Sequence, residues 1–358
     1  MPYESGIMKT IDQRPKVFFI PWSQKDRLKD LLGLSRAAEA IHEGDFVAVK
    51  MHFGERGTDG YIRPEYVKPV IEMIRAANAR PFLTDTNTVY SGPRRDAVGH
   101  LEVAAEHGFT QEAMGVPILI SDGVRGTDFV EVPVKGRHFK RVKIASGICD
   151  ADSMIVLSHV KGHLLAGFGG ALKNLGMGCG ARTGKFEMHS SLSPEVDLEK
   201  CEGCGTCVAT CGQKAIQIVE GHAVIDSSLC AGCGECIVEC PYGAIGVQWS
   251  EGAQGVQERF VEYATGAMAG RRAFFINFIN HVSPNCDCMS RGETPMVPDI
   301  GILASADPVA IDQASYDLVF KAGGDVFEKA HPGIDCTIQL AYAEKMGLGR
   351  RSYELVGI

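Results

Sequence analysis

The side chains with the plainest chemical potential in this sequence are cysteines. Of the 13 cysteines, eight lie between residues 201 and 240. They form two runs in which successive cysteines are separated by two, two and three residues, and the second run begins at Cys230, 29 residues after Cys201. The runs consist of Cys201, Cys204, Cys207 and Cys211, and of Cys230, Cys233, Cys236 and Cys240. This repeated spacing is typical of bacterial two-cluster ferredoxins, in which the fourth cysteine of each run serves the cluster of the other run.

The spacing therefore predicts two [4Fe–4S] clusters with crossed ligation. The first cluster is expected on Cys201, Cys204, Cys207 and Cys240, and the second on Cys211, Cys230, Cys233 and Cys236. A pair of structural zinc sites is the alternative for a segment this rich in thiols. Zinc ribbons use pairs of cysteines two residues apart rather than runs of four, so the spacing favours iron–sulfur clusters.

The segment that carries these cysteines is acidic. Between Asp197 and Val247 there are seven acidic residues and two lysines. Because opposite charges speed the encounter of two proteins, an acidic module suits docking to a basic redox partner protein. A face that only keeps the module in solution would have the same composition, and charge alone does not separate the two roles.

A second segment combines glycine with positive charge. No acidic residue occurs from Ser153 to Phe186, although lysine or arginine stands at positions 161, 173, 182 and 185. Glycine lets backbone N–H groups approach an anion, and lysine balances the anion's charge. We therefore expect an anionic substrate or cofactor here, and the candidate binding residues are Lys161, Lys173, Asn174, Gly169 and Gly170. No complete nucleotide-binding fingerprint is present, and glycines that serve only close packing are the alternative.

Histidines and the remaining thiols supply further candidates. His52 follows an apolar run and His163 lies within the glycine-rich segment, so both are candidate catalytic residues. Cys286 and Cys288 are separated by one residue, and together with Cys179 they could bind a third metal or form a redox-active dithiol. A structural thiol is the alternative for each of them.

The elements that would position these residues alternate between strands and helices. Strand-sized apolar runs occupy residues 17–20, 46–51, 81–84, 116–120, 129–134, 154–157, 272–279 and 300–304, and helical patterns occupy 63–79, 94–108, 256–269, 307–321 and 336–346. This alternation predicts an α/β fold whose mostly parallel sheet is flanked by helices. We expect a core built from residues 1–193 and 249–358, with an inserted α+β, ferredoxin-like two-cluster domain at 194–248. Two separate flanking domains are less favoured, because neither flank ends in a polar linker.

The composition of the chain limits the classes of protein to which it can belong. Of the 358 residues, 45% are hydrophobic and 22% are charged, which is ordinary for a globular protein. No apolar stretch of about 18 residues occurs, so no membrane span is expected, and the N-terminus lacks the apolar run of a signal peptide. A net charge of −8 argues against a nucleic-acid-binding face. A cytoplasmic protein is therefore expected, and nothing in the sequence indicates its oligomeric state.

Seven local patterns outside the cysteine runs carry a resemblance. They are VAVKMHFGE at 47–55, TDTN at 84–87, SHVKGH at 158–163, GGALKNLGMG at 169–178, CDC at 286–288, PDIGI at 298–302 and SADPVAID at 305–312. Together they resemble the domain of unknown function 362 family over almost the whole chain, with the ferredoxin-like module inserted. The resemblance implies an iron–sulfur protein with an α/β core, typical of anaerobic metabolism, and it implies no substrate.

Three functional hypotheses follow from these features. The first is an oxidoreductase or electron-transfer protein that passes electrons from the cluster module to an anionic ligand in the core, with His52 as a proton donor. The second is a dedicated electron carrier without its own substrate, although a plain two-cluster ferredoxin needs only a short chain. The third is a metal- or cluster-delivery protein with the thiols at 179, 286 and 288 as its handover site. We favour the first hypothesis, without a specific reaction.

Overall fold

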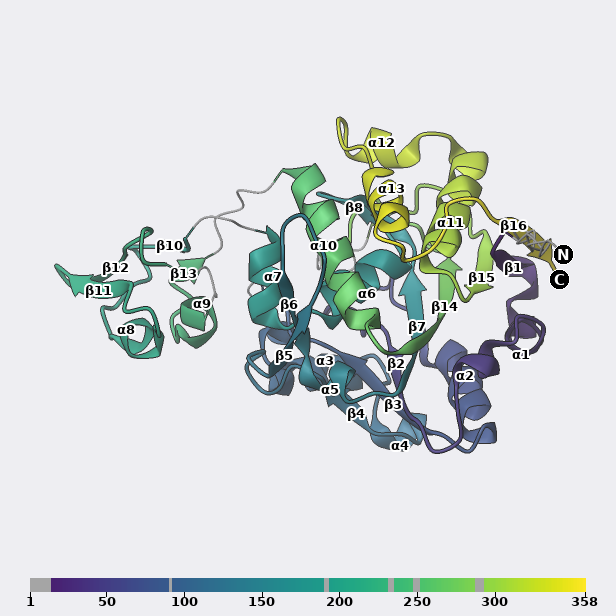
Figure 1. Ribbon diagram of the computed structural model, residues 1–358, viewed down its shortest axis with the longest axis horizontal. Coiled ribbons are helices and arrows are strands. Elements are labelled where there is room, and N and C mark those ends of the chain that lie inside the picture. The colour runs from purple at the N-terminus through teal and green to yellow at the C-terminus, as the bar shows by residue number, and fades with distance from the viewer. Residues whose placement is uncertain (1–13, 90–91, 190–192, 231–234, 247–251, 287–292) are drawn as a thin grey trace, which may run out of the picture.

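The structure is a computed structural model that describes residues 14–89, 92–189, 193–230, 235–246, 252–286 and 293–358 (Figure 1). The strands of its main sheet are β1 (Lys16–Pro21), β2 (Phe46–Lys50), β3 (Arg80–Asp85), β4 (Ile118–Ile120), β7 (Ser153–His159), β14 (Arg272–Ile279), β15 (Gly301–Ser305) and β16 (Glu354–Gly357). They lie in the order β16-β1-β15-β14-β7-β2-β3-β4. Neighbouring strands are parallel except at β15, which runs antiparallel to β1 and β14.

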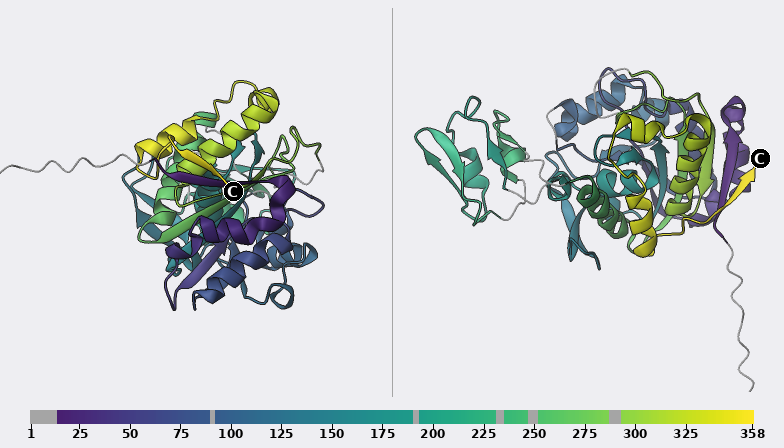
Figure 2. Two further views of the ribbon diagram at one scale, coloured as in Figure 1. Left: turned by 90° about the vertical axis from the view of Figure 1, so that its right-hand side faces the viewer. Right: turned by 90° about the horizontal axis from the view of Figure 1, so that it is seen from above.

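Helices cover both faces of this sheet, and each face has its own hydrophobic core (Figure 2). In β7, Met154 and Val156 enter one core, whereas Ile155 and Leu157 enter the other. Because successive side chains of a strand point to opposite faces, a strand covered on both sides needs apolar residues at consecutive positions. The first core is covered by α6 (Ala171–Cys179), α10 (Ala253–Met268), α11 (Pro308–Gly323) and α13 (Ile338–Lys345), and the second by α1 (Leu28–Leu34) and α2 (Pro64–Ala76). The predicted α/β fold with a mostly parallel sheet flanked by helices is confirmed.

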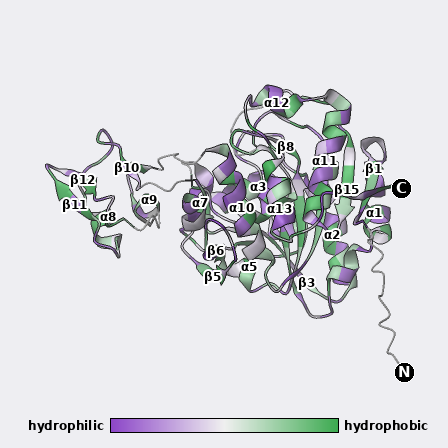
Figure 3. Cartoon of the chain, turned by 45° about the horizontal axis from the view of Figure 1, so that its top comes forward, coloured by the Kyte–Doolittle hydropathy of each residue, from purple (hydrophilic) through white to green (hydrophobic). Residues whose placement is uncertain are grey.

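The strands of the sheet are largely hydrophobic along their length, whereas hydrophilic and hydrophobic residues alternate along the helices (Figure 3). Within the described part of the chain, no helix combines the length and the apolarity that a bilayer span requires. The remaining elements outside the cysteine module are η1 (Trp22–Arg27), η2 (Ala37–Ala40), η3 (Pro93–Arg95), α3 (Ala97–Glu106), α4 (Gln111–Met114), α5 (Ser146–Cys149), α7 (Arg182–His189), α12 (Val326–Ala330), β5 (Phe129–Pro133), β6 (Arg141–Ala145), β8 (Lys161–His163) and β9 (Gly167–Gly169).

Most of the predicted elements are present within a few residues of their expected bounds. The helical pattern at 63–79 corresponds to α2, which has a proline in its first turn. The apolar run at 129–134 is also a strand, but β5 pairs with β6 in a separate hairpin and does not join the main sheet. Residues 159–189, which are rich in glycine, have no clear helical or strand period in the sequence, yet they fold into the hairpin β8–β9 and the helices α6 and α7.

Residues 193–230 and 235–246 form a small lobe at the α7 end of the molecule (Figures 1 and 2). Its elements are β10 (Glu195–Val196), α8 (Thr206–Thr210), β11 (Ile216–Val219), β12 (His222–Ile225), α9 (Glu235–Glu239) and β13 (Ile245–Gly246). Strands that precede and follow this lobe in the chain enter the same eight-stranded sheet. Glu195 in β10 lies opposite Gly246 in β13, so the chain enters and leaves the lobe at one place.

Candidate functional site

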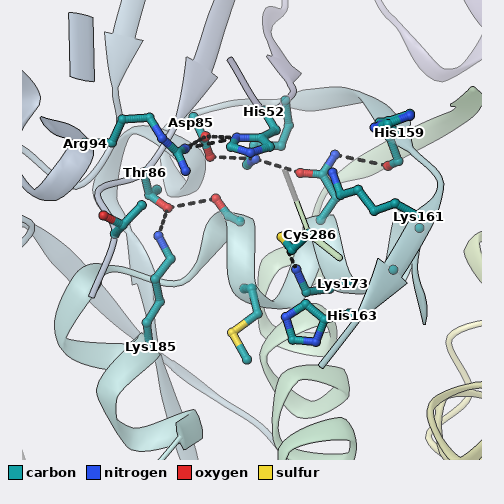
Figure 4. Close-up of a pocket in the computed structure, with 18 of the residues that line it drawn as sticks. His52, Asp85, Thr86, Arg94, His159, Lys161, His163, Lys173, Lys185 and Cys286 are labelled. Carbon is teal, nitrogen blue, oxygen red and sulfur yellow. Dashed lines mark hydrogen bonds and ion pairs between the residues drawn. The ribbon is translucent and has the colours of Figure 1, made fainter. Parts of the chain in front are cut away.

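A cavity of about 550 Å³ lies at the carboxyl ends of the central strands (Figure 4). β2, β3 and β7 are parallel neighbours in the order β7-β2-β3, and residues at or just beyond the end of each strand line the cavity. Lys50 comes from β2, Asp85 from β3 and His159 from β7. Open α/β sheets bind their ligands at this edge, so the fold itself makes the cavity a candidate functional site.

Most of the predicted site residues outside the two cysteine runs line this one cavity. They are His52, Lys161, His163, Gly169, Gly170, Lys173, Asn174 and Cys286. Cys179 is fully buried outside the lining, and burial raises the pKa of its thiol to about 11. Arg182 is also buried away from the cavity, where its backbone N–H donates to the Asp122 carboxylate. Cys288 lies outside the described residues.

The lining is strongly cationic. Among the described residues it contains five cationic side chains and one carboxylate. The cations are Lys50, Arg94, Lys161, Lys173 and Lys185, and the carboxylate is that of Asp85. A partly enclosed space with an excess of one charge concentrates ligands of the opposite charge, so the cavity favours an anion.

Lys50 and Asn174 are both committed to the protein. Lys50 Nζ donates to Asp85 Oδ1 at 2.9 Å, to Asn174 Oδ1 at 2.7 Å and to a backbone carbonyl oxygen at 2.8 Å. These contacts use the three N–H groups of its ammonium. The Asn174 amide nitrogen in turn donates to the Leu157 carbonyl oxygen at 2.8 Å and to Ser158 Oγ at 3.1 Å. The two side chains therefore shape the wall of the cavity and have no donor left for a ligand.

Asp85 is the anionic centre of a buried network. Its Oδ2 lies 3.5 Å from Arg94 Nη1, 3.5 Å from His52 Nδ1 and 3.6 Å from His100 Nε2. Arg94 Nε also donates to Glu55 Oε2 at 3.0 Å. Burial alone would raise the pKa of the Asp85 carboxyl, but the lysine ammonium beside it and the two imidazoles hold that pKa well below its usual range.

The histidines that line the cavity with a resolved pKa shift are neutral at physiological pH. Burial, followed by the positive charge of Arg94, lowers the pKa of His52 to about 4. Burial and nearby lysines lower the pKa of His189 to about 3. Burial, followed by the charge of Lys173, lowers the pKa of His163 well below its usual value. These imidazoles can exchange hydrogen bonds with a ligand, but they are not imidazolium acids at neutral pH.

Lys185 behaves differently from these histidines. Burial lowers the pKa of its ammonium to about 8, although Asp122 and Asp85 act in the opposite direction. Its Nζ donates to Thr86 Oγ1 at 2.6 Å and to the Asn87 carbonyl oxygen. Both of these partners are neutral, and a third N–H remains. Lys185 is therefore a buried cation that can change its charge close to neutral pH.

The N-terminus of α6, where the glycine-rich sequence predicts an anion, holds an internal carboxylate. The N–H groups of Ala171 and Leu172 donate to Asp312 Oδ1 and Oδ2 at 2.7 and 2.8 Å. Burial raises the pKa of Asp312 to about 6 despite these bonds. A Cβ at Gly170 would lie 2.3 Å from Asp312 Oδ1, so this glycine is needed for the close approach of the carboxylate. These two backbone donors at the helix end are thus satisfied within the protein.

Four cysteines of the small lobe surround one small cavity. Cys201, Cys204, Cys207 and Cys240, the predicted ligands of the first cluster, all line it. Backbone N–H groups point at two of the sulfurs, because Ala223 N donates to Cys201 Sγ and Ala244 N to Cys240 Sγ, both at 3.3 Å. Such bonds stabilise thiolates that bind iron. In type, number and hydrogen bonding, these cysteines fit a [4Fe–4S] cluster.

The second set of predicted ligands is described in part. Cys211, Cys230 and Cys236 are among the described residues, whereas Cys233 is not. Ala215 N donates to Cys211 Sγ at 3.3 Å, which repeats the pattern of the first set. No three described His, Cys, Asp or Glu side chains converge on the position of a single metal ion. The thiolates of a [4Fe–4S] cluster each bind a different iron, so their sulfurs lie further apart than the ligands of one ion.

The residues that organise the cavity were not among the site residues predicted from the sequence. Lys50 and Asp85 stand at the ends of β2 and β3, and this position at strand ends is a signal that could have identified them. Arg94 gives no such signal, because its partner Glu55 is 39 residues away in the chain. His100 is fully buried beside Asp85 and carries no sequence signal either.

Comparison with known proteins identifies a family. The family described as "Domain of unknown function (DUF362)" matches residues 47–317, and no curated protein matches the chain. The lactate racemase apoprotein from Thermoanaerobacterium thermosaccharolyticum is similar in structure with a TM-score of 0.39, at 12% identity over 75% of this chain and 51% of its own. A protein from Thermotoga maritima has a TM-score of 0.38, at 11% identity over 88% of this chain and 58% of its own. This chain thus spans between half and three fifths of those two proteins. By its sequence, the chain belongs to the DUF362 family.

Proposed function

We propose that this protein is an iron–sulfur oxidoreductase that exchanges electrons with an organic anion bound in the cavity at the carboxyl ends of β2, β3 and β7. The observation that carries the proposal is the charge of this cavity, in which five cationic side chains face one carboxylate among the described lining residues. A protein that only carried electrons would need no such cavity. An anion in this cavity would be the terminus of the electron route.

The electrons would reach the core from two [4Fe–4S] clusters in the small lobe. The cysteines proposed to hold them are Cys201, Cys204, Cys207 and Cys240 for one cluster and Cys211, Cys230, Cys233 and Cys236 for the other. Clusters of this type would supply single electrons at low potential. The shared cavity of the first four cysteines and the three N–H···S bonds at 3.3 Å support this assignment.

Packing between the lobe and the core supports a route for electrons through protein. Val89 lines the cavity, and it belongs to the same buried hydrophobic cluster as Phe186 and Cys240. Arg125 of the core also forms an ion pair with Glu239 of the lobe. The remaining acidic residues of the lobe would face a basic redox partner protein.

The residues that line the cavity would have different roles at the bound anion. Lys161 and Lys173 would bind its charged group, because charge-assisted hydrogen bonds are stronger than neutral ones. Lys185, with a pKa of about 8, can supply a proton near neutral pH. His52, with a pKa of about 4, is a neutral imidazole in the same range. We therefore assign proton donation to Lys185 and hydrogen bonding to His52.

The alternative of a metal- or cluster-delivery protein has less support. Its handover site would need accessible thiols that act together, but Cys179 is fully buried and keeps its proton at neutral pH. Cys286 lines the cavity beside Lys173, at 3.4 Å from its Nζ. Its position suits contact with the proposed anion as well as contact with a metal. No observation therefore favours delivery over redox chemistry.

The proposal is tested with anaerobically purified protein. Each chain should contain about eight iron and about eight sulfide, and dithionite should bleach the visible absorption. After removal of dithionite, the reduced protein should be reoxidised by members of a panel of unsaturated and oxo carboxylates. Lys173→Met should slow this reoxidation at least about tenfold, whereas Lys68→Met, at an exposed position of α2, should not change it. Stoichiometric zinc, or equal reoxidation rates in both variants, would contradict the proposal.

A further inference from the structure

The imidazole of His163 is fixed in one tautomer by the backbone. Its Nδ1 accepts the backbone N–H of Leu165 at 3.2 Å and that of Ala166 at 3.1 Å. A backbone N–H can only donate, so Nδ1 must present its lone pair to both groups. The ring proton of the neutral imidazole is therefore on Nε2. The described residues give Nε2 no hydrogen-bond partner, and the His163 side chain lines the cavity.

His163 lies beside a cation at the same part of the wall. Figure 4 places the His163 ring next to Lys173, whose Nζ is 3.4 Å from Cys286 Sγ. Burial and the nearby ammonium both disfavour a second positive charge on the imidazole, which keeps it neutral. The cavity thus offers one N–H donor of fixed direction and one ammonium, side by side. Two such donors match the two oxygens of a carboxylate.

The rest of the cavity distinguishes between classes of anion. The N–H groups at the start of α6, which could cradle a phosphate, already bind the Asp312 carboxylate at 2.7 and 2.8 Å. Apolar side chains make up much of the remaining wall, and they include Ile62, Val89, Leu157, Leu164, Leu165 and Met177. A ligand that fills this space needs an apolar body as well as an anionic group.

We propose that the cavity binds carboxylic acids with an apolar body, and that His163 Nε2–H and Lys173 Nζ together hold the carboxylate. The inference rests on the proposed function, which it deepens by naming the class of ligand. His163 acts as a binding residue in this arrangement: it donates a hydrogen bond and keeps its proton. The apolar walls would then hold the body of the acid away from water.

Three probes of the same shape and different charge test the ligand class. They are phenylacetate, 2-phenylethanol and phenethylamine, each titrated into the full-length holoprotein by calorimetry at neutral pH. Phenylacetate should bind at least about tenfold more tightly than the other two. Lys173→Met should weaken phenylacetate binding by about tenfold or more, whereas Lys68→Met should leave it unchanged. Equal affinities for the three probes, or no binding of phenylacetate at millimolar concentration, would overturn the inference.

Two substitutions separate a ligand contact of His163 from a structural role. In His163→Asn, the amide oxygen replaces Nδ1 as acceptor for the loop N–H groups, but the donor to the ligand is lost. In His163→Gln, the amide nitrogen can reach the position of Nε2, so the donor is kept. We expect His163→Asn to bind phenylacetate at least about tenfold more weakly, and His163→Gln to stay within about threefold of the parent protein. The reverse order would show that His163 serves only the loop.

A spectroscopic readout keeps this inference separate from the proposed redox function. In protein labelled with ¹⁵N-histidine, His163 should show an unprotonated Nδ1 and a protonated Nε2 from pH 6 to pH 8, without any ligand. A protonated Nδ1 would overturn the assigned role. Iron and sulfide contents and cluster reoxidation are measured on the same samples. If these fail while phenylacetate binding behaves as expected, the redox proposal is wrong and the carboxylate site stands.

Discussion

Single residues in the cavity differ in whether their charge is already matched. The Lys50 ammonium is surrounded by three acceptors, one of them the Asp85 carboxylate. Arg94 pairs with the Glu55 carboxylate at 3.0 Å. The contacts of Lys185 are instead with uncharged oxygens, and its pKa is lowered as a result of burial. Of these three cations, Lys185 is therefore the one whose charge responds most directly to an incoming anion and to pH.

The affinity for an anion should consequently fall as the pH rises through the pKa of Lys185. This pKa is about 8, so the ammonium is largely present at pH 7 and largely lost at pH 9.5. Asp122 and Asp85, the carboxylates that face Lys185, stay ionised over this range. Calorimetric titration with phenylacetate should therefore show binding at least about threefold weaker at pH 9.5 than at pH 7. In Lys185→Met, the affinity should be lower at pH 7 and should change less with pH. If the affinity of Lys185→Met for phenylacetate fell between pH 7 and pH 9.5 by as much as that of the parent protein, the pH dependence would belong to another group.

At the scale of elements, strands and helices with a clear period were predictable, and those held by distant contacts were not. The apolar runs and amphipathic patterns predicted most of the main sheet and its long helices. The residues that these elements bury recur with the period of a strand or a helix, so a local stretch of sequence is enough to recognise them. α6 is different, since its two glycines, Gly176 and Gly178, disfavour a helix. Its first turn is stabilised by Asp312, about 140 residues further along the chain. No local pattern signals such a contact.

The same distinction explains which parts of the site were predictable. The lysines and His163 were identified because they stand close together in one segment, and the eight cysteines because their spacing repeats. The Asp85 network joins residues from β2, β3, η3 and α3, so its members meet only when the sheet forms. The positions of Lys50 and Asp85 at strand ends are the trace of this arrangement in the sequence.

The substitution Gly176→Ala tests how tightly α6 packs against its neighbour α10. Alanine is the better helix former by about 0.5–1 kcal/mol, so helix propensity alone predicts that Gly176→Ala stabilises the protein. A Cβ at this position would however lie 2.1 Å from the carbonyl oxygen of Phe260. Overpacking of this kind costs about 1–3 kcal/mol, which exceeds the gain in helix propensity. The free energy of unfolding of Gly176→Ala should therefore fall. Urea denaturation followed by circular dichroism measures the difference.

Gly33 in α1 is the matched control for this substitution. A Cβ there would have no heavy atom within 4 Å, so only the gain in helix propensity remains. Gly33→Ala should therefore leave the free energy of unfolding unchanged or raise it by up to about 1 kcal/mol. If both variants were stabilised, the contact between α6 and α10 would be less tight than the structure indicates.

For the whole molecule, the order of strands in the main sheet argues that the segments before and after the lobe fold as one unit. β14 and β15 come from the C-terminal segment, yet they lie between β1 and β7 of the N-terminal segment. Removing the C-terminal segment would leave β1 without its antiparallel partner and would expose an edge of β7 in the middle of the sheet. Residues 1–190 expressed alone should therefore show no cooperative thermal transition.

Removing the lobe should have the opposite outcome. Glu195 and Gly246 are directly paired across β10 and β13, and paired residues in a sheet lie roughly 5 Å apart. A short glycine–serine linker in place of residues 194–247 can therefore join the two segments without straining the sheet. The deletion uncovers Val89 and Phe186, which pack against the lobe, so the melting temperature should fall. Circular dichroism should nevertheless record a single cooperative transition, because both hydrophobic cores of the main sheet remain complete. If the deleted protein failed to melt cooperatively while residues 1–190 alone did so, the chain would consist of separate domains.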